Sequence, residues 1–320
     1  MKLTVIGPGR WGSFIAFYLK ERGHDVLLYG RNGSAAFSRL RATRQNDLLT
    51  FPEDMRFSSD LQQALAFSDI ILISIASQNL RGLLEHFGSA AKGKTLVLCM
   101  KGLEVSTGMR LSQVVDDVLG STVQCAIWVG PGHVEEFSRG IPNCMVIDAQ
   151  DNALKHRLVA LFSSDLIRFY YGEDLIGNEI GAASKNVIGI AAGMLDGFGV
   201  SSLKGALMSR GTREIARLIK AMGGRELSAY GLAHLGDYEA TVFSPHSHNR
   251  RFGEAFIKKE PYDALAEGYY TVKALCALGE SYGVDLPICR TVYTVLYEGT
   301  EPKTALNALF TRSIKEEFYQ

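Results

Sequence analysis

The sequence predicts two domains: a doubly wound α/β domain with a parallel sheet, followed by an all-helical domain. With 320 residues, the chain exceeds the roughly 100–200 residues of a usual single domain. Short apolar runs alternate with helical patterns up to about Tyr171, and beyond it the apolar spacing is helical. We therefore expect one domain over residues 1–172 and a second over residues 173–320.

Six short apolar runs predict the strands of the first domain. They are continuous rather than alternating, as expected for strands buried on both faces of a parallel sheet. Helical stretches such as 14–22 and 61–67 lie between them, which is typical of a doubly wound sheet. The predicted strands are residues 3–6, 26–29, 70–75, 95–99, 126–129 and 144–147.

Helical spacing dominates the second half of the chain. The apolar residues of four long stretches recur at three- and four-residue intervals, as on one face of a helix. We expect these helices to be punctuated by Gly193, Asp196-Gly197, Gly223-Gly224 and Pro287. The predicted helices are residues 174–195, 202–222, 264–282 and 291–297.

Composition excludes several function classes. The 34 basic and 34 acidic residues cancel, so the chain has no overall field to attract nucleic acid or an anionic membrane. No apolar run approaches the ~18–20 residues that span a bilayer, and glycine arrives too early for a secretory signal. The five cysteines form no CxxC pair, which favours free thiols and no metal site. We expect a cytoplasmic protein.

A glycine-rich turn follows the first predicted strand. Residues 7–12 read Gly-Pro-Gly-Arg-Trp-Gly. Gly7 permits the tight turn, Gly9 lets a pyrophosphate approach the backbone, and Gly12 lets the next helix pack on the strand. Because strand, turn and helix occur in the required order, we interpret the first domain as a Rossmann dinucleotide-binding domain. Arg10 and Trp11 of the turn are further cofactor-binding candidates.

The second predicted strand ends without the acid that usually binds the ribose hydroxyls of NAD. Arg31 stands there instead, and a guanidinium can pair with a 2′-phosphate. The cofactor is therefore NADP or NAD, with Arg31 a solvated surface residue in the second case.

Five further stretches carry a family resemblance. In this order, after the glycine-rich start, they resemble the NAD(P)-dependent glycerol-3-phosphate dehydrogenases of the bacterial type over nearly the whole chain. They are KGLE at 101–104, GPGH at 130–133, GAASKNV at 181–187, GLAHLGD at 231–237 and SHNRRFG at 247–253.

The resemblance implies reversible oxidation of sn-glycerol 3-phosphate to dihydroxyacetone phosphate, with the reduction feeding phospholipid synthesis. It also implies a homodimer whose only ligands are small molecules, among them a phosphorylated substrate. A related two-domain dehydrogenase with an altered 2-hydroxy substrate, and a catalytically inactive NAD(P)H-binding regulator, are the alternatives.

Lys185 is the candidate acid and base. Hydride transfer at an alcohol carbon needs a group that moves the hydroxyl proton near neutral pH. The neighbours of Lys185 are small or apolar, so we expect a buried lysine whose pKa is lowered by desolvation. A lysine extending to solvent from a helix surface is the alternative. In the family the matching lysine is the catalytic acid and base.

Three more residues are candidates for substrate contact. Lys101 follows a predicted strand, at the sheet edge where doubly wound folds bind ligands. By resemblance Lys101 polarises the substrate oxygen, Gly130 lines the same cleft, and Asp237 contacts the substrate hydroxyls and holds Lys185. An exposed turn aspartate is the alternative for Asp237. Asn186 and Thr241 are weaker candidates behind this set.

Clustered donors predict the phosphate site. Ser247, His248, Asn249, Arg250 and Arg251 are consecutive, and this density of donors suits phosphate recognition. An idle basic loop is the alternative. By resemblance, His248 would also contact the cofactor, as would Lys101, Glu267 and Val134. Gly132 would lie beside the substrate.

Two positions depart from the family pattern. The family has arginine where His248 stands, and that arginine bridges the substrate phosphate and the cofactor. It has Ser-Phe where Gly132-His133 stand, so a hydroxyl beside the substrate is missing. Arg250 or Arg251 is expected to compensate for the missing guanidinium. Both departures concern substrate recognition, so weaker phosphate binding and a related substrate both stay open.

Overall fold

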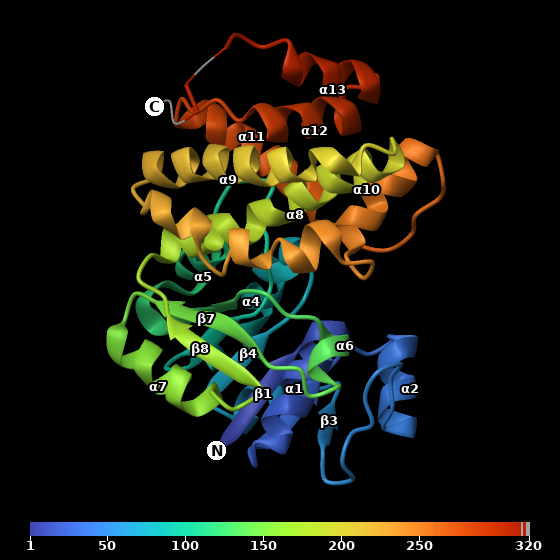
Figure 1. Cartoon of the computed structure of the whole chain (residues 1–320). Helices are drawn as coiled ribbons and strands as arrows, with labels where there is room; N and C mark the ends of the chain where they lie inside the picture. The colour runs from blue at the N-terminus through green and yellow to red at the C-terminus, as the bar shows by residue number, and fades with distance from the viewer. Residues whose placement is uncertain (315, 318–320) are drawn as a thin grey trace. The chain divides into compact units, whose positions relative to one another are not determined.

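The computed structural model describes residues 1–314, 316 and 317, and by its internal contacts the chain forms two compact units (Figure 1). The first unit contains residues 1–100, 111–128 and 132–172. The second contains the chain from residue 173 onward together with two loops from the first half, 101–110 and 129–131.

In the described residues, eight strands form one sheet in the order β3-β2-β1-β4-β5-β6-β7-β8. The pairs β2–β3, β1–β2, β1–β4, β4–β5, β5–β6 and β7–β8 are parallel. All six predicted strands are present. The strands are β1 (Lys2–Ile6), β2 (Asp25–Tyr29), β3 (Arg56–Ser58), β4 (Ile70–Ile73), β5 (Thr95–Leu98), β6 (Gln124–Val129), β7 (Asn143–Ala149) and β8 (Ile167–Tyr171).

The sequence prediction missed the two outermost strands. The strand β3 has only three residues, and β8 alternates between buried and exposed side chains in its first three positions. The prediction searched for continuous apolar runs, which mark strands in the middle of a sheet. An edge strand that is buried on one face lacks that signal.

Helices of the first unit connect the strands. They are α1 (Arg10–Glu21), α2 (Ala35–Thr43), α3 (Leu61–Phe67), α4 (Leu80–Phe87), α5 (Leu111–Leu119), α6 (Val134–Phe137) and α7 (Asn152–Phe162), with short 3₁₀ turns η1 (Ser77–Asn79), η2 (Gly88–Ala91) and η3 (Gly120–Thr122).

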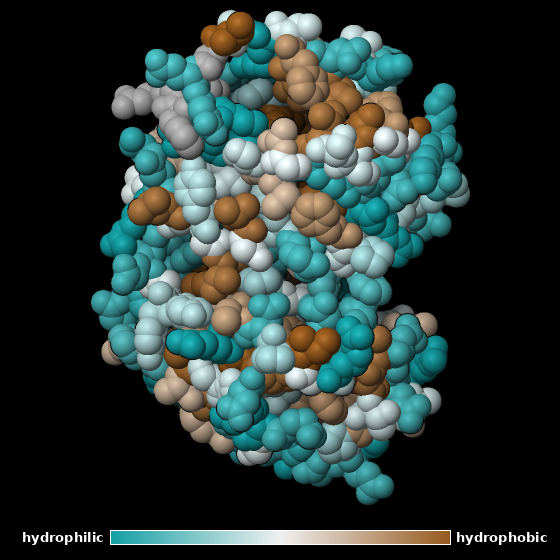
Figure 2. All heavy atoms as spheres, viewed as in Figure 1, coloured by the Kyte–Doolittle hydropathy of each residue, from teal (hydrophilic) through white to brown (hydrophobic). Residues whose placement is uncertain are grey.

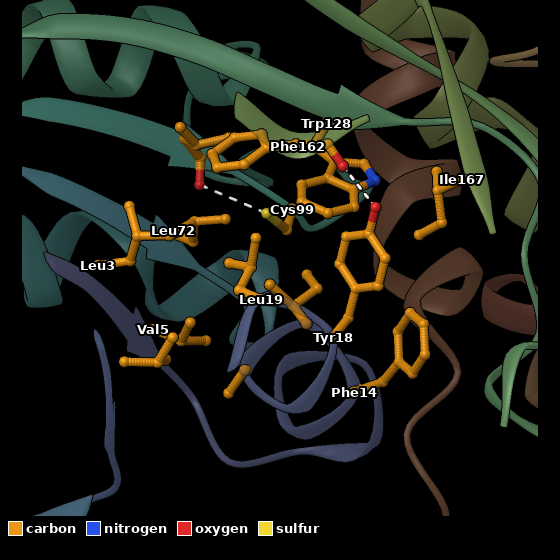
Figure 3. Close-up of a cluster of buried hydrophobic side chains, with 14 of the residues drawn as sticks. Leu3, Val5, Phe14, Tyr18, Leu19, Leu72, Cys99, Trp128, Phe162 and Ile167 are labelled. Atoms are coloured by element: carbon orange, nitrogen blue, oxygen red, sulfur yellow. Dashed lines mark hydrogen bonds between the residues drawn. The ribbon is translucent and has the colours of Figure 1, made fainter. Parts of the chain in front are cut away.

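Aromatic side chains join α1 to the sheet and to α7 (Figure 3). Trp128 is fully buried and stacks on Phe162 with 5.3 Å between ring centroids. The hydroxyl of Tyr18 donates to the carbonyl of Phe162 at 2.5 Å and lies 2.7 Å from Ser164 Oγ. A buried tyrosine thus has its polar end satisfied, and α1 is fixed against the sheet that carries the glycine-rich turn.

The second unit is built around α8 (Leu175–Gly197), which is buried continuously from Gly177 to Leu195 and packs against α9 to α12. No helix in residues 1–314, 316 and 317 is long and apolar enough to cross a membrane. The other elements are η4 (Ser201–Leu203), α9 (Lys204–Ala221), η5 (Glu226–Tyr230), η6 (Leu235–Asp237), a π-helical turn η7 (Glu239–Phe243), α10 (His248–Lys258), α11 (Glu267–Ser281), α12 (Pro287–Tyr297) and α13 (Pro302–Phe310).

Gly193 does not punctuate a helix, contrary to the prediction, because α8 continues through it to Gly197. A Cβ atom at Gly193 would lie 1.8 Å from the carbonyl oxygen of Arg250, and one at Gly253 would lie 2.1 Å from that of Ile190. These glycines therefore allow the backbones of α8 and α10 to touch. Residues 247–251 were interpreted as phosphate donors, so the helix α10 that begins at His248 was missed.

Candidate active site

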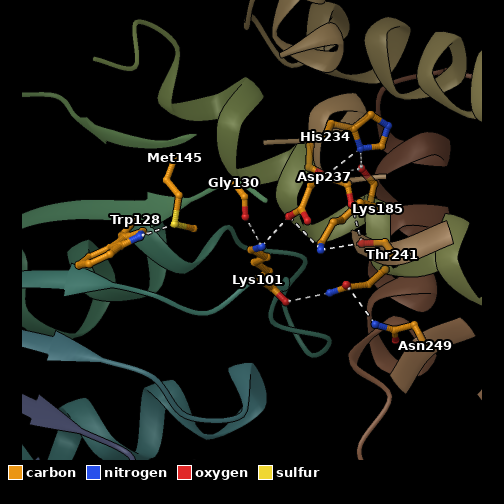
Figure 4. Close-up of polar contacts among 12 residues, drawn as sticks. Lys101, Trp128, Gly130, Met145, Lys185, His234, Asp237, Thr241 and Asn249 are labelled. Atoms are coloured by element: carbon orange, nitrogen blue, oxygen red, sulfur yellow. Dashed lines mark hydrogen bonds and ion pairs between the residues drawn. The ribbon is translucent and has the colours of Figure 1, made fainter. Parts of the chain in front are cut away.

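Lys185 lies in the middle of α8 and is 7% exposed. Its amine donates to Thr241 Oγ1 at 2.7 Å and lies 2.9 Å from Asp237 Oδ2 (Figure 4). Small and apolar neighbours bury α8 along its length, so the amine is largely shielded from bulk water and depends on these two partners. The alternative of a lysine extending to solvent does not describe this side chain.

Lys101 meets the same carboxylate. It begins the loop 101–110, just after β5, and its amine donates to the carbonyl of Gly130 at 2.8 Å and to Asp237 Oδ2 at 2.5 Å. The ends of β5 and β6 thus supply the lysine and the carbonyl. Lys101, Gly130, Lys185 and Asp237 form one cluster within the second unit, which we call the lysine–aspartate cluster.

Asp237 is 1% exposed and ends the 3₁₀ turn η6. Its Oδ2 atom serves both lysines, whereas Oδ1 has no hydrogen-bond partner among the residues that the structure describes. A buried acceptor without a partner costs free energy unless a ligand satisfies it. The Oδ1 atom is therefore the candidate acceptor for the substrate hydroxyl that the resemblance assigned to Asp237.

Burial lowers the pKa of Lys185 to about 8. Desolvation is the main cause, the positive charge of Lys101 adds to it, and the negative charge of Asp237 opposes it. An amine that titrates near neutral pH can give a proton in one direction and take it back in the other. The cluster therefore has the acid–base property that was expected of Lys185.

Two asparagines tie this cluster to α10 and α11. Asn186 Nδ2 donates to the carbonyl of Lys101 at 3.3 Å, and Asn249 Nδ2 donates to Asn186 Oδ1 at 3.1 Å. The amide of Gly268 donates to Asn249 Oδ1 at 2.9 Å. The side-chain oxygen of Asn249 and one of its two N–H groups are thus engaged in hydrogen bonds within this network. Glu267 begins α11 beside Gly268, and its cofactor contact stays a prediction.

The predicted phosphate donors separate in the structure. The Ser247 side chain caps α10 by accepting from the Arg250 amide at 3.3 Å. Arg250 Nε pairs with Asp196 Oδ2 at 2.5 Å, and Lys204 binds the same oxygen at 2.7 Å. Arg250 is therefore engaged at the C-terminal end of α8. This ion pair is an obstacle to the expected compensation for the missing guanidinium.

His248 is exposed and shares a partner with Arg251. Its Nδ1 atom lies 2.7 Å from the hydroxyl of Tyr262, and the Arg251 guanidinium lies 5.8 Å from the Tyr262 ring centroid. The sequence reasoning missed Tyr262, which lies in a polar stretch without helical spacing. Tyr262 therefore contacts both His248 and Arg251, the two other basic candidates in the stretch 247–253.

The glycine-rich turn of the first unit can accommodate a pyrophosphate. Gly7 has φ of +107°, and a Cβ there would lie 2.1 Å from the carbonyl oxygen of Ser74. A Cβ at Gly12 would lie 2.0 Å from the carbonyl oxygen of Gly7, whereas one at Gly9 would meet no described atom within 4 Å. Gly9 precedes α1 without a side-chain cap, so free N–H groups face that open space.

Four other cofactor candidates lie in the first unit. Arg31 is exposed beyond the end of β2. Arg10 forms an ion pair with Glu135, and Trp11 stacks on Phe14 with 5.4 Å between centroids. Val134 is buried at the start of α6. Their cofactor contacts stay predictions.

Gly132 has a steric role that the sequence did not indicate. A Cβ there would lie 2.5 Å from the ring of Phe137. Serine, the family's residue at this position, therefore requires Phe137 to move.

An apolar cavity of about 580 Å³ lies elsewhere in the second unit, between α8, α9, α12 and α13. Figure 2 shows hydrophobic side chains over α12 and α13, and Phe310 is 65% exposed. None of the residues of the lysine–aspartate cluster lines this cavity. The lysine–aspartate cluster, rather than this apolar cavity, carries the groups for acid–base chemistry. No group of three His, Cys, Asp or Glu side chains in the described part of the chain is arranged to hold a metal.

A Rossmann turn and a buried acid–base lysine on a helical unit define the class of two-domain nicotinamide-dependent dehydrogenases. Two family models match the chain: the NAD-dependent glycerol-3-phosphate dehydrogenase N-terminus over residues 2–155, and the corresponding C-terminus over residues 174–307. The chain belongs to the NAD-dependent glycerol-3-phosphate dehydrogenase family.

Relatives match over the full length. The glycerol-3-phosphate dehydrogenase (NAD(P)+) of Pelodictyon phaeoclathratiforme is 35% identical and covered to 99%, as is this chain. That of Streptomyces coelicolor is 36% identical, with 99% of this chain and 98% of the relative covered. The structure of glycerol-3-phosphate dehydrogenase from Coxiella burnetii matches with a TM-score of 0.91 and 27% identity, covering 97% and 99% of the two chains. A ketopantoate reductase from Ralstonia eutropha, at 15% identity and a TM-score of 0.63, shares the fold.

Proposed function

We propose that this protein interconverts sn-glycerol 3-phosphate and dihydroxyacetone phosphate with NAD or NADP. The observation that carries the proposal is the buried Lys185 amine, 2.9 Å from a carboxylate that keeps one oxygen without a hydrogen-bond partner in the described part of the chain. The full-length relatives named glycerol-3-phosphate dehydrogenase (NAD(P)+) support the substrate and the cofactor.

Each residue of the lysine–aspartate cluster has a role in this reaction. The nicotinamide, when bound, supplies or accepts the hydride at the central carbon of the substrate. In the reduction, Lys185 Nζ gives its proton to the carbonyl oxygen, and in the oxidation it takes that proton back. Lys101 places a positive charge beside the same oxygen, and Asp237 holds both amines in place. Asp237 Oδ1 is the acceptor for a substrate hydroxyl.

The phosphate group of the substrate is assigned to the start of α10. Ser247, His248 and Asn249 lie at the N-terminus of α10, whose first amides suit an anion. With Arg250 paired to Asp196, His248 stands where the resemblance implies an arginine. These departures favour weak phosphate binding, or a related 2-hydroxy substrate as the second candidate.

The cellular context is also part of the proposal. We place the enzyme in the cytoplasm, where it supplies glycerol 3-phosphate for phospholipid synthesis. All five cysteines are free thiols, which suits a reducing compartment. We propose a homodimer on the strength of the family resemblance, and sedimentation of the purified chain measures it.

The test is oxidation of NADH and NADPH by the purified chain with dihydroxyacetone phosphate and, in parallel, with unphosphorylated 2-oxo acids. We expect turnover with the phosphate ester. Lys185→Met should reduce kcat by about 10²–10⁴-fold, the range for loss of a general acid, and should retain cofactor binding measured by fluorescence.

Lys155→Met is the matched control. Lys155 is also a buried lysine, 6% exposed and paired with Asp148 at 3.4 Å in the first unit. Its replacement should leave kcat of the folded enzyme unchanged. Turnover only with a 2-oxo acid would favour the second candidate, and cofactor binding without turnover of any compound would favour an inactive regulator.

A further inference from the structure

A second set of hydrogen-bonded polar side chains lies buried behind the lysine–aspartate cluster, and the proposed reaction does not use it. The His234 ring, fully buried, has Nδ1 at 2.8 Å from the carbonyl oxygen of Gly181 and 3.4 Å from Ser184 Oγ. On its other side, Nε2 lies 2.7 Å from the hydroxyl of the equally buried Tyr238. The sequence reasoning singled out neither residue.

The partners of His234 settle which atoms carry protons. The Gly181 carbonyl can only accept, so Nδ1 carries the hydrogen and donates it. Burial lowers the pKa of His234 to about 4, so Nε2 carries no hydrogen at neutral pH and accepts from Tyr238. Burial raises the pKa of the Tyr238 hydroxyl, which therefore remains a donor. Both ring nitrogens are satisfied in a single orientation.

This hydrogen-bonded set connects the two elements that carry the reacting groups. Gly181 lies one helical turn before Lys185 and on the same face of α8. The absent side chain of Gly181 makes room for His234, because a Cβ there would lie 3.0 Å from His234 Cβ. Asp237 follows His234 by three residues in the turn η6. The His234 ring thus ties the Asp237 turn to the helical turn of Lys185.

Tyr238 lies at the other end of this hydrogen-bonded set. Its hydroxyl lies beside α9, because a Cβ at Gly211 would lie 3.5 Å from it. The segment that carries Asp237 is therefore packed against α9 and hydrogen-bonded to α8 through His234.

We propose that His234 and Tyr238 form a positioning pair that keeps the Asp237 carboxylate against the Lys185 amine. This inference rests on the proposed function for its kinetic consequences. The pair touches neither amine through its own hydrogen bonds, so it acts through the placement of Asp237.

Tyr238→Phe is the sharpest perturbation, since it deletes one hydroxyl and keeps the ring. It leaves His234 Nε2 without its donor in the core. The His234 ring then shifts and carries the Asp237 turn with it. The ionisable groups that bear on the Lys185 amine are Asp237, Lys101 and the neutral His234. A more distant Asp237 lowers the pKa of Lys185, because its negative charge opposes the effect of burial.

We therefore expect the high-pH limb of kcat/KM for reduction to move to lower pH in Tyr238→Phe, by roughly half a unit to one unit. We expect kcat at pH 8 to fall several-fold with KM for the substrate nearly unchanged. If the pair acts as one unit, the double variant His234→Gln with Tyr238→Phe should lose no more than His234→Gln alone.

Tyr18→Phe is the matched control. It also deletes a buried tyrosine hydroxyl with two partners, at 2.5 and 2.7 Å, but in the core of the first unit. It should lower thermal stability and leave the pH profile in place. An equal shift in Tyr18→Phe and Tyr238→Phe, or no shift in Tyr238→Phe, would overturn the positioning role.

A second readout separates this inference from the proposed function. The Lys185 amine can be titrated by NMR in the full chain with labelled lysine, assigned with Lys185→Met, without any turnover. A lower Lys185 pKa in Tyr238→Phe supports the positioning pair even if dihydroxyacetone phosphate is not the substrate. Identical titrations in wild type and variant refute it even if the enzyme is active.

Discussion

Asp237→Asn removes the carboxylate that Lys101 and Lys185 contact at 2.5 and 2.9 Å, at almost constant side-chain volume. The negative charge of Asp237 opposes the desolvation that lowers the pKa of Lys185. Its removal should therefore lower that pKa further and leave too little protonated lysine at the pH where the wild-type enzyme works.

The size of the effect follows from the charge that is lost. An opposite charge at this range changes a pKa by about 1–3 units. Taking ~2 units, the Lys185 pKa falls from about 8 to roughly 6. At pH 7.5 the protonated fraction then drops from about three quarters to about 3%, a loss of roughly 25-fold. At pH 5.5 about three quarters is protonated again, so most of that loss disappears.

The assay is kcat/KM for reduction of dihydroxyacetone phosphate from pH 5.5 to 9.5, because this quantity reports the free enzyme. Asp148→Asn provides the control. Asp148 is also 1% exposed and lies 3.4 Å from the buried Lys155 amine, in the first unit. The Asp148→Asn variant should be less stable than the wild type, but the midpoint of its pH profile should stay near that of the wild type.

A midpoint in Asp237→Asn that stays near 8 or rises would refute the reasoning. Lys185 would then owe its low pKa to something other than the balance between burial and this carboxylate. A loss of activity that is equal at every pH would assign Asp237 to substrate binding alone.

Three other predictions test separate features. Gly9→Ala should fold normally and raise the Kd for NADPH about tenfold. Gly12→Ala places a Cβ 2.0 Å from a carbonyl oxygen, so it should lower Tm by several degrees. Equal effects of the two variants in binding and melting assays would contradict the assignment of the turn. His248→Arg should lower KM for the phosphate ester several-fold by restoring a guanidinium, and an unchanged KM would mean that another residue already fills that role. Burial raises the pKa of Glu214 to about 7, above its unfolded value, so the free energy of unfolding should fall by up to about 3 kcal/mol as pH rises from 4.5 to 7. Urea titrations of wild type and Glu214→Gln check this, since the variant should lack that part of the slope.

The central strands and the lysine site could be predicted because their signals are local. A fully apolar run such as β4 indicates burial on both faces, and the small neighbours of Lys185 indicate a crowded helix. Lys101 and Gly130 follow consecutive strands in parallel register, so their proximity follows from sheet topology.

Other features depend on pairings across the chain. Arg250 and Asp196 are 54 residues apart, and no periodicity distinguishes an arginine that will meet an aspartate from one that will meet phosphate. His234 gave no signal either, because its neutrality arises from burial between α8 and Tyr238. The end of α8 was placed well, whereas Gly193 was misinterpreted because helical contact and helix termination both favour glycine.

The assignment of loops 101–110 and 129–131 to the helical unit bears on how such an enzyme can be dissected or recombined. A gene fragment starting at codon 173 would encode the helices and Lys185 but neither Lys101 nor the Gly130 carbonyl. Conversely, grafting the N-terminal half of one relative onto the C-terminal half of another would exchange part of the reacting cluster along with the nucleotide fold. Chimeras that preserve the chemistry must therefore inherit three separate stretches of chain from the same parent.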